Sequence, residues 1–499
     1  MRTAYDVETI RAAERALMAR LPDGALMQRA AAGLAAACAG LLGKVYGARV
    51  ALLIGSGDNG GDALYAGARL ARRGAGVTAL TLSPQRTHPG GLAALRAAGG
   101  TVLDAESATA ADTVARADLV LDGIVGIGGK GGLRPRAAQL AAGATESRGL
   151  VVAVDLPSGV DAETGEVRGD AVRADATVTF GTYKPGLLVD PAHEYAGALR
   201  LVDIGLELPA ADASLGALQH DDVAALLPKP TGESDKYRRG VVGVVAGSER
   251  YPGAAVLATA GALHGGAGAV RYVGPAADSV LSRFPETLVS AGPPSKAGRV
   301  QAWVIGPGLG DDAAGLSDVL ASDVPVLIDA DGLRLADVEA VRSRSAPTVL
   351  TPHAGEAAAL LGCDRKQVEA ERLSSVRELA ARYGATVLLK GSTTLIASPD
   401  GDGVPVRVNP TGTPWLATAG SGDVLSGLTG SLLAAGLRPA DAASVGAYLH
   451  GLAARHAAQG APVSAQDVAS AVRVVWRDIS AARPSARMRS RERPRPGGG

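Results

Sequence analysis

Short apolar runs alternate along this chain with longer segments that show helical periodicity. In the first half, strands are predicted at Val50–Ile54, Val77–Leu82, Leu119–Leu121, Leu150–Val154, Thr177–Phe180 and Leu199–Val202, and helices at Asp62–Arg73 and Pro135–Glu146. Strands that are apolar throughout and alternate with helices are typical of a mostly parallel sheet covered on both faces. The first half therefore predicts a three-layer α/β/α domain.

The second half repeats this alternation with different spacing. Strands are predicted at Val241–Ala246, Ala269–Val273, Ala302–Ile305, Val326–Ile328, Thr348–Leu350 and Thr386–Leu389, and helices at Ala254–His264, Glu369–Tyr383, Ala440–Ala458 and Ala465–Trp476. The halves show no mutual repeat, so we expect two unlike α/β domains, over residues 1–211 and 212–482. The Arg/Pro/Gly-rich tail, 483–499, has almost no apolar residues and is predicted to be disordered.

Composition agrees with two soluble domains. At 499 residues the chain is too long for one core, and 47% hydrophobic residues are enough for two. Lys+Arg and Asp+Glu are both 50, which argues against nucleic acid or a membrane surface as a general partner. Cys38 and Cys363 fall in different predicted domains, so a reducing cytoplasm is expected. The charged first 30 residues are no signal peptide, and the apolar run Ala30–Leu42 is predicted to be a buried helix, since it is shorter than the roughly 20 residues of a membrane span.

The stretch from Gly420 to Gly427, GSGDVLSG, is the strongest chemical signal in the second half. Small residues let backbone N–H groups approach a ligand, and a helix that begins there directs its dipole at an anion. Asp423 then lies where a carboxylate can take a proton from a hydroxyl beside bound phosphate. A lone Gly-x-Gly-Asp would more often be a tight turn with a capping Asp.

Four further segments in the same half favour function over a simple turn. They read GSERYPGAA at 247–255, IGPGLG at 305–310, TPHAGE at 351–356 and KGSTT at 390–394. Lys390 follows a predicted strand and is suited to a nucleotide phosphate. His353 fits a ligand role and a helix-capping role equally well. Because no Gly-x-x-x-x-Gly-Lys-[Ser/Thr] occurs, this is not a P-loop ATPase.

In the first half, polar residues follow three neighbouring predicted strands. Gly55, Gly57 and Gly60 satisfy Gly-x-Gly-x-x-Gly, but a lone match is weak, and no acid follows the next strand at Leu80–Ser83. Carboxyl ends of parallel strands share one sheet edge, so Asn59, Asp122 and Ser158 are expected to converge there as oxygen ligands of a hard cation. The loop Gly126–Gly132, with Lys130, is expected to bind phosphates, and Asp155 to act as an acid or base. Each acid taken alone is most often a helix cap.

The segments GSGDNGGD, DGIVGIGGKGG and VDLPSGVDAETG resemble the epimerase domain of the NAD(P)H-hydrate repair family, a Rossmann-like fold, over residues 1–209. The resemblance implies potassium at Asn59, Asp122 and Ser158 and catalysis at Asp155. It implies substrate binding by Asp58, Asn59, Gly60, Gly61, Asp62, Gly126, Ile127, Gly128, Gly129, Lys130, Gly131, Gly132 and Asp155. Asp58 and Ala63 depart from the family, which commonly has Asn and Gly there.

TPHAGE together with NPTGTP and AGSGDVLSG resembles the ADP-dependent NAD(P)H-hydrate dehydratase family, which has a ribokinase-like fold, over residues 219–477. The resemblance implies nucleotide binding by Lys390, Gly391, Ser392, Thr393, Thr394 and Gly422. It implies contact with the hydrated cofactor by Ala254, Gly308, His353 and the catalytic Asp423, with Mg²⁺ as helper. Trp415 stands where the family usually has Gly.

The two resemblances imply a bifunctional, cytoplasmic enzyme. It would interconvert the R and S forms of hydrated NADH and NADPH and dehydrate the S form, with ADP as donor and AMP and phosphate as products. The expected partners are these small molecules and further copies of the chain, without nucleic acid or membrane. The alternative is a ribokinase-like small-molecule kinase fused to a module that binds a dinucleotide without catalysis.

Overall fold

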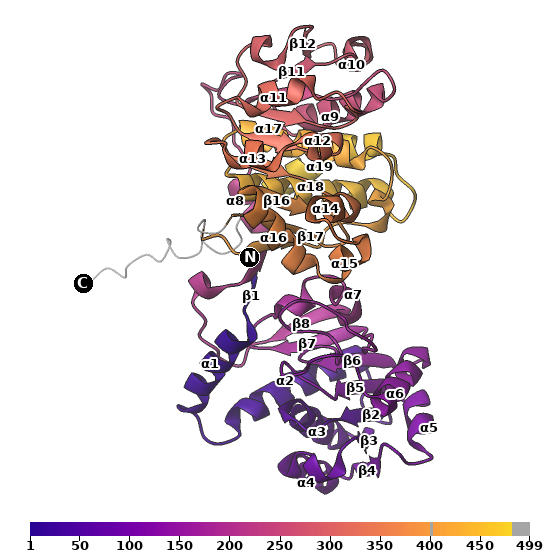
Figure 1. The fold of residues 1–499 in the computed structure, drawn as a ribbon. Helices are drawn as coiled ribbons and strands as arrows, with labels where there is room; N and C mark the ends of the chain where they lie inside the picture. Colours follow the sequence, from indigo (N-terminus) through magenta and orange to yellow (C-terminus); the bar gives the residue numbers. More distant parts are fainter. Residues whose placement is uncertain (400–402, 482–499) are drawn as a thin grey trace, which may run out of the picture. The chain divides into compact units, whose positions relative to one another are not determined.

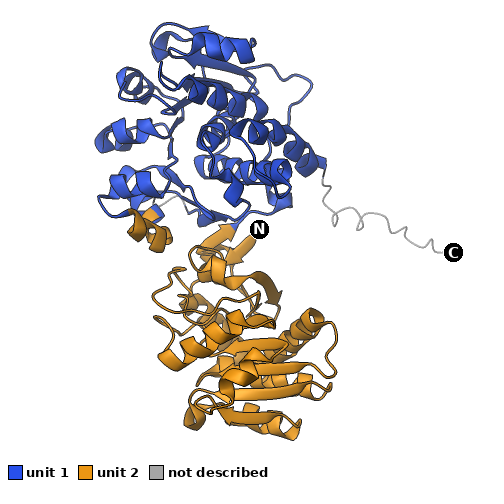
Figure 2. Ribbon diagram, turned by 90° about the vertical axis from the view of Figure 1, so that its right-hand side faces the viewer, with its two compact units in different colours: residues 1, 217–364, 376–499 blue, residues 2–216, 365–375 orange. Residues whose placement is uncertain are grey.

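A computed structural model describes residues 1–399 and 403–481 (Figure 1). The chain divides into two compact units (Figure 2). One, here the N-terminal unit, comprises residues 2–216 and 365–375; the other, the C-terminal unit, comprises residue 1, residues 217–364 and the described residues from 376 onward. The predicted assignment of 1–211 and 212–482 to separate activities stays a prediction, and the predicted tail 483–499 lies outside the described residues.

The N-terminal unit contains a seven-stranded sheet in the order β4-β3-β2-β5-β6-β7-β8, visible as a ladder in the purple part of Figure 1. Its strands are β2 (Arg49–Ile54), β3 (Gly76–Thr81), β4 (Thr101–Asp104), β5 (Leu119–Gly123), β6 (Leu150–Val154), β7 (Ala176–Phe180) and β8 (Ala198–Val202). All neighbouring pairs are parallel. The predicted parallel α/β architecture is therefore confirmed, and β4 is a strand that the sequence pattern missed.

Alternate residues of β2 are buried in two different cores, which shows that both sheet faces are covered. Leu52 and Ile54 pack in one cluster, whereas Ala51 and Leu53 pack in the other. The first face carries α2 (Ala25–Leu42), α3 (Asp58–Ala71) and α4 (Pro89–Ala97), and the second carries α5 (Ala110–Ala115) and α6 (Pro135–Glu146). This unit also contains β1 (Arg2–Ala4), α1 (Val7–Met18), α7 (His193–Ala196) and α15 (Arg365–Ala370).

Helix α2 is longer than the predicted apolar run and spans 18 residues. By length and composition alone it is apolar enough to cross a membrane, and it is the one such helix within the described residues. Leu34 and Cys38 on this helix are fully buried in the core with the sheet and α3. Its apolar face is thus used in packing, as predicted for a buried helix.

The C-terminal unit contains strands in the order β18-β17-β16-β15-β14-β13-β10-β11-β12. They are β10 (Val241–Val245), β11 (Ala269–Val273), β12 (Leu288–Ser290), β13 (Ala302–Ile305), β14 (Val326–Ile328), β15 (Thr348–Leu350), β16 (Thr386–Leu389), β17 (Thr394–Ala397) and β18 (Val406–Asn409). Pairs from β12 to β16 are parallel, and β16–β17 and β17–β18 are antiparallel. A second predicted α/β sheet is confirmed; short β9 (Leu215–Ala217) lies at the unit boundary.

Helices cover both faces of this sheet as well. One core joins α9 (Pro252–His264), α17 (Ser421–Ala434), α18 (Pro439–Ala458) and α19 (Ala465–Ala481). The connections β10-α9-β11 and β13-α11-β14 run in opposite directions along the strand order, so right-handed crossovers place their helices on opposite faces. The remaining helices are α8 (His220–Leu226), α10 (Ala277–Arg283), α11 (Ala314–Leu320), α12 (Asp331–Leu335), α13 (Val338–Arg342), α14 (Ala354–Leu361) and α16 (Arg372–Tyr383). The first four residues of α16 belong to the N-terminal unit. The predicted helix Glu369–Tyr383 is in fact divided between α15 and α16.

Each sheet has a point at which the direction of the strand order reverses. In the N-terminal unit it lies between β2 and β5, and in the C-terminal unit between β10 and β13. Ligands of open α/β sheets bind at such points, beyond the carboxyl ends of the strands. Four predicted site segments follow these strands directly, and the others follow β6, β15 and β16 or begin α17.

Candidate active sites

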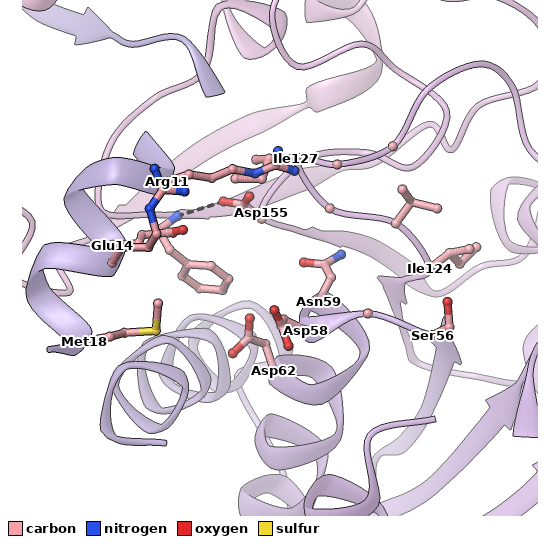
Figure 3. A pocket seen from close by; sticks show the side chains of 17 residues that line it. Arg11, Glu14, Met18, Ser56, Asp58, Asn59, Asp62, Ile124, Ile127 and Asp155 are labelled. Carbon is pink, nitrogen blue, oxygen red and sulfur yellow. Dashed lines mark hydrogen bonds between the residues drawn. The ribbon is translucent and has the colours of Figure 1, made fainter. Parts of the chain in front are cut away.

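A cavity of about 480 Å³ lies at the carboxyl edge of the sheet in the N-terminal unit (Figure 3). Its walls are the turn after β2, the loop after β5, the end of β6, and helix α1, which sequence analysis had not implicated. The predicted residues that line it are Asp58, Asn59, Asp62, Gly126, Ile127, Gly128, Gly129 and Asp155. Gly60 and Gly61 are buried in the first turns of α3, and Lys130, Gly131 and Gly132 continue the β5 loop beyond the lining.

The turn after β2 and the loop after β5 touch through backbone. A Cβ on Gly55 would lie 1.8 Å from the carbonyl oxygen of Ile124, so only glycine fits there. Gly55 and Gly60 of the predicted Gly-x-Gly-x-x-Gly therefore serve close packing at the strand-order reversal, whereas a Cβ on Gly57 would meet nothing within 4 Å. Ala63, one of the departures from the family pattern, is fully buried beside Gly123, and Asp58, the other, lines the cavity.

Asp155 ends β6 with a left-handed backbone, at φ 69°. Its carboxylate accepts hydrogen bonds from Thr179 Oγ1 at 3.1 Å, from the Phe180 N–H at 3.2 Å and from the ammonium of Lys184. Lys184 is only 1% exposed and also donates to Thr179 Oγ1 and Phe180 O. A strained backbone that persists because several contacts hold it is typical of functional sites. The arrangement holds an ion-paired carboxyl group in one orientation at the cavity wall.

Two further acids at this cavity lie in surroundings that oppose ionisation. Burial, with the charge of Asp155 next in size, raises the pKa of Asp62 well above its usual range. Burial and then Asp155 also raise the pKa of Glu14, on α1. Asp62 Oδ1 is buried and finds no hydrogen-bond partner among the described residues. The cavity therefore combines one ion-paired carboxylate with acids that favour the neutral form.

Two of the three predicted potassium ligands, Asp122 and Ser158, are in direct contact. Ser158 donates from Oγ to Asp122 Oδ1 at 2.6 Å and from its N–H to Oδ2 at 2.8 Å. Asn59 is buried, its side chain lies against Gly126, and its amide nitrogen has no partner among the described residues. Burial raises the pKa of Asp122 to about 6, although the hydrogen bonds from Ser158 act to lower it. Carboxylate, hydroxyl and amide oxygens suit a hard cation.

In the C-terminal unit, Lys390 at the end of β16 lies against the start of α17. Its ammonium donates to Asp329 Oδ1 at 2.8 Å and lies 3.7 Å from Glu356. Burial acts to lower the pKa of Lys390, but Asp329 and Glu356 outweigh it and the pKa is raised. A Cβ on Gly422 would lie 3.5 Å from the Lys390 nitrogen, so these two predicted nucleotide residues are neighbours. Gly391, Ser392 and Thr393 follow directly, and Thr394 begins β17.

Asp423 lies in the first turn of α17, behind the left-handed Gly420. Burial raises its pKa to about 7, Asp329 and Asp331 act in the same direction, and Lys390 opposes them. A carboxyl with this pKa can gain and lose a proton near neutrality, as a general acid/base requires. The arrangement agrees with the predicted role of Asp423.

His353 caps helix α14. Its Nδ1 accepts from the N–H groups of Gly355 at 3.0 Å and Glu356 at 3.1 Å, and the Glu356 side chain accepts from the His353 N–H. The capping alternative is thus realised, and the other ring nitrogen, Nε2, lies 3.6 Å from a Glu356 carboxylate oxygen. Ala254 and Gly308 adjoin across the strand-order reversal, since a Cβ on Gly308 would lie 2.7 Å from that of Ala254. Trp415 is 41% exposed, in the turn before α17.

Among the charged residues of these sites that sequence reasoning missed are Glu14, Lys184 and Asp329. Asp329 had a usable signal, because it follows the predicted strand Val326–Ile328 directly. Lys184 had a weaker signal as a lone lysine after a strand, and Glu14 had none, since α1 reads as an ordinary amphipathic helix.

Comparisons with known proteins agree with these observations. A family model described as NAD(P)H-hydrate dehydratase matches residues 242–473, and one described as YjeF-related protein N-terminus matches 23–186. The bifunctional NAD(P)H-hydrate repair enzyme Nnr of Mycobacterium leprae is 51% identical, over 91% of this chain and 94% of its own length. That of Mycobacterium tuberculosis (strain CDC 1551 / Oshkosh) is 52% identical, over 89% and 92%. A crystal structure of ADP/ATP-dependent NAD(P)H-hydrate dehydratase from Bacillus subtilis, co-crystallized with ATP/Mg²⁺, is 29% identical, covers 52% of this chain and 97% of that chain, and has a TM-score of 0.48.

Proposed function

This chain belongs to the family of bifunctional NAD(P)H-hydrate repair enzymes, and we propose on that basis how its two units divide the work. The N-terminal unit interconverts the R and S forms of hydrated NADH and NADPH. The C-terminal unit dehydrates the S form, with ADP consumed and AMP and phosphate released. The observation that carries the proposal is the pair of acids, Asp155 and Asp423. Asp155 follows β6 and lines the cavity at the carboxyl edge of its sheet, and Asp423 lies in the first turn of α17 with a raised pKa.

Epimerisation needs reversible loss of the hydroxyl on C6 of the hydrated nicotinamide ring. The neighbouring ring nitrogen assists departure of the hydroxyl, and water can then return on either face. Asp155 is suited to move the proton because Lys184 and Thr179 hold its carboxylate in one orientation at the cavity wall. The loop that contains Gly126–Gly129 lines the same cavity and supplies backbone N–H groups for the substrate phosphates.

Dehydration needs a better leaving group than hydroxide. Asp423 orients and deprotonates the C6 hydroxyl, and the N–H groups at the start of α17 stabilise charge on the phosphoryl group that is transferred. Lys390 provides a fixed positive charge beside Gly422 for the nucleotide phosphates. Phosphate then leaves with help from the ring nitrogen. Only one configuration at C6 places the hydroxyl beside Asp423. The epimerase converts the other isomer into this form, so that it too can be dehydrated.

Two metal ions complete the proposal. Mg²⁺ binds one or two carboxylates together with substrate phosphates, and Asp331 and Glu356 beside the nucleotide site fit this role. When bound it would neutralise phosphate charge. Potassium would be held by Asn59, Asp122 and Ser158, whose contact through the Asp122 carboxylate supports an oxygen site. We further propose a homo-oligomer in the cytoplasm, with hydrated NADH and NADPH and ADP as its small-molecule partners.

The test is to incubate mixed R and S hydrates with ADP, and separately with ATP, and to follow each isomer by chromatography and the product by its absorbance. The full chain should consume both isomers, and Asp155→Asn should consume the S form and leave the R form. A small-molecule kinase with a binding module would instead leave a stable phosphate ester. That product, or R consumption by Asp155→Asn at the normal rate, would contradict the proposal.

A further inference from the structure

Two carboxyl groups face the cavity of the N-terminal unit from opposite walls. Asp155 comes from the end of β6 and Asp62 from the second turn of α3, and Figure 3 shows both side chains directed into the space between these elements. A hydrated nicotinamide ring placed between the two walls would present one face to each carboxyl. This geometry matters because inversion at C6 requires chemistry on both faces.

The surroundings of the two carboxyls differ. Asp155 accepts hydrogen bonds from Lys184, Thr179 and the Phe180 N–H, and its carboxylate is ion-paired with the Lys184 ammonium. Asp62 Oδ1 is buried without a partner among the described residues, and no cation pairs with Asp62 there. The charged groups around Asp62 are Asp155, Asp58 and Glu14, which oppose its ionisation, and Lys184, which favours it. Burial is the largest influence, and its pKa is raised. Enzymes commonly place two acids in different surroundings, so that one acts as the proton donor and the other as the base.

We propose that Asp62 is a second catalytic residue of the epimerase, the proton donor that works on the ring face opposite Asp155. The inference rests on the proposed epimerase function and goes beyond its binding role. In the first step the ring nitrogen's lone pair forms the N1=C6 bond and the C6–O bond breaks. The departing oxygen takes the proton of the Asp62 carboxyl and leaves as water, so Asp62 becomes ionised.

The return step uses the other wall. Water adds to C6 from the Asp155 side, the N1=C6 electron pair returns to nitrogen, and the added water gives its proton to the Asp155 carboxylate. The configuration at C6 is inverted and no atom is gained or lost. Asp62 is now ionised and Asp155 protonated, which is the state that the reverse conversion needs. A proton that passes from Asp155 to Asp62 through water resets the site.

The experiment uses the full chain as Asp62→Asn, which keeps the side chain's shape but cannot donate a carboxyl proton. Asp112→Asn, an exposed acid on α5 outside the cavity, is the matched control. R-to-S exchange of the hydrate is measured without nucleotide, hydrate affinity is measured by the ligand-dependent shift of the melting temperature, and dehydration of the S form is measured with ADP. We expect exchange to fall by about 100-fold or more in Asp62→Asn. Affinity should stay within about threefold, and dehydration and the Asp112→Asn control should be unchanged.

A pH profile separates proton donation from a structural role. Exchange by the wild-type chain should decline on the alkaline side, where Asp62 loses its proton, and Asp62→Asn should lack this decline. Exchange by Asp62→Asn within about threefold of wild type, or a loss of exchange matched by an equal loss of affinity, overturns the inference. If Asp62→Asn fails to fold, Asp62→Ser is judged by the same criteria. If the wild-type chain itself shows no exchange above the enzyme-free rate, the proposed epimerase function fails instead.

Discussion

Lys390 Nζ donates to Asp329 Oδ1 at 2.8 Å, and the other oxygen of the same carboxylate accepts from Ser426 Oγ at 2.6 Å. Asp329 is 1% exposed, so one buried carboxylate ties the end of β16 to helix α17. The helix that presents Asp423 and the lysine proposed to meet phosphate are therefore held by a single side chain. Asp329 is a positioning residue for the C-terminal site.

Replacement of Asp329 should disturb stability and nucleotide binding together. Asp329→Ala leaves the Lys390 ammonium without its nearest acid, and we expect a loss of about 2–4 kcal/mol in the free energy of unfolding, less than for a fully buried pair because Glu356 remains nearby. Asp329→Asn should lose less and should raise KM for ADP about tenfold, because Lys390 is no longer held. Thermal melts and steady-state kinetics test this, with the exposed Asp323→Asn as control. An unchanged KM in Asp329→Asn would show that the contact does not position Lys390.

The raised pKa of Asp423 predicts a pH dependence with a definite sign. The carboxyl must be ionised to act as a base, so the dehydration rate should rise with pH through about 7. Because the folded state binds a proton that the unfolded state releases between about pH 4 and 7, the free energy of unfolding should fall across this window. Asp423→Asn should lack that fall and exceed wild type by about 1–3 kcal/mol at pH 8 without ligands, with dehydration reduced about 100-fold or more. Rate profiles and denaturant titrations at several pH values are the measurements.

Lys184→Met should inactivate the N-terminal unit alone. Without the ammonium, the buried Asp155 carboxylate loses its ion pair and a contact that fixes its orientation at the cavity wall, so it can no longer serve efficiently as a base. We expect R-to-S exchange to fall about 100-fold or more and unfolding of this unit to become easier by about 2–4 kcal/mol, with dehydration of the S form retained. The exposed Lys44→Met is the matched control. Normal exchange by Lys184→Met would show that Asp155 does not depend on its ion pair.

Gly308 and Gly310 offer a comparison between crowding and backbone strain. Both are left-handed, at φ 65° and 66°, but a Cβ on Gly308 would meet Ala254 at 2.7 Å, whereas one on Gly310 would meet nothing within 4 Å. Gly310→Ala should cost about 1 kcal/mol from backbone conformation alone. Gly308→Ala should cost about 1–3 kcal/mol more and raise KM for the hydrate, because the contact between two loops must open. Equal melting temperatures for the two variants would contradict this.

The sequence by itself determined the secondary structure close to residue level where periodicity was strong. Leu150–Val154, Ala269–Val273 and Pro135–Glu146 have the predicted bounds. The family motifs also predicted roles for Asp155 and Asp423, because phosphate loops and strand-end acids occur in contiguous segments; these roles stay predictions. The helix Glu369–Tyr383 was wrong as a single element, since α15 ends at Ala370. The prediction also missed β17 and β18, two antiparallel strands of four residues each.

Only the tertiary structure decided which charges meet. Lys184 lies 29 positions from Asp155 and Lys390 lies 61 from Asp329, and no local pattern encodes either pair. The alternatives at His353 also needed coordinates, because a capping histidine and a ligand histidine have the same sequence context. Strand order brings distant strand ends to one edge, and burial at that edge then sets which acids hold their protons. The local sequence determines where a helix or strand forms. The electrostatics of a site depend on residues that are distant in the sequence and come together only on folding.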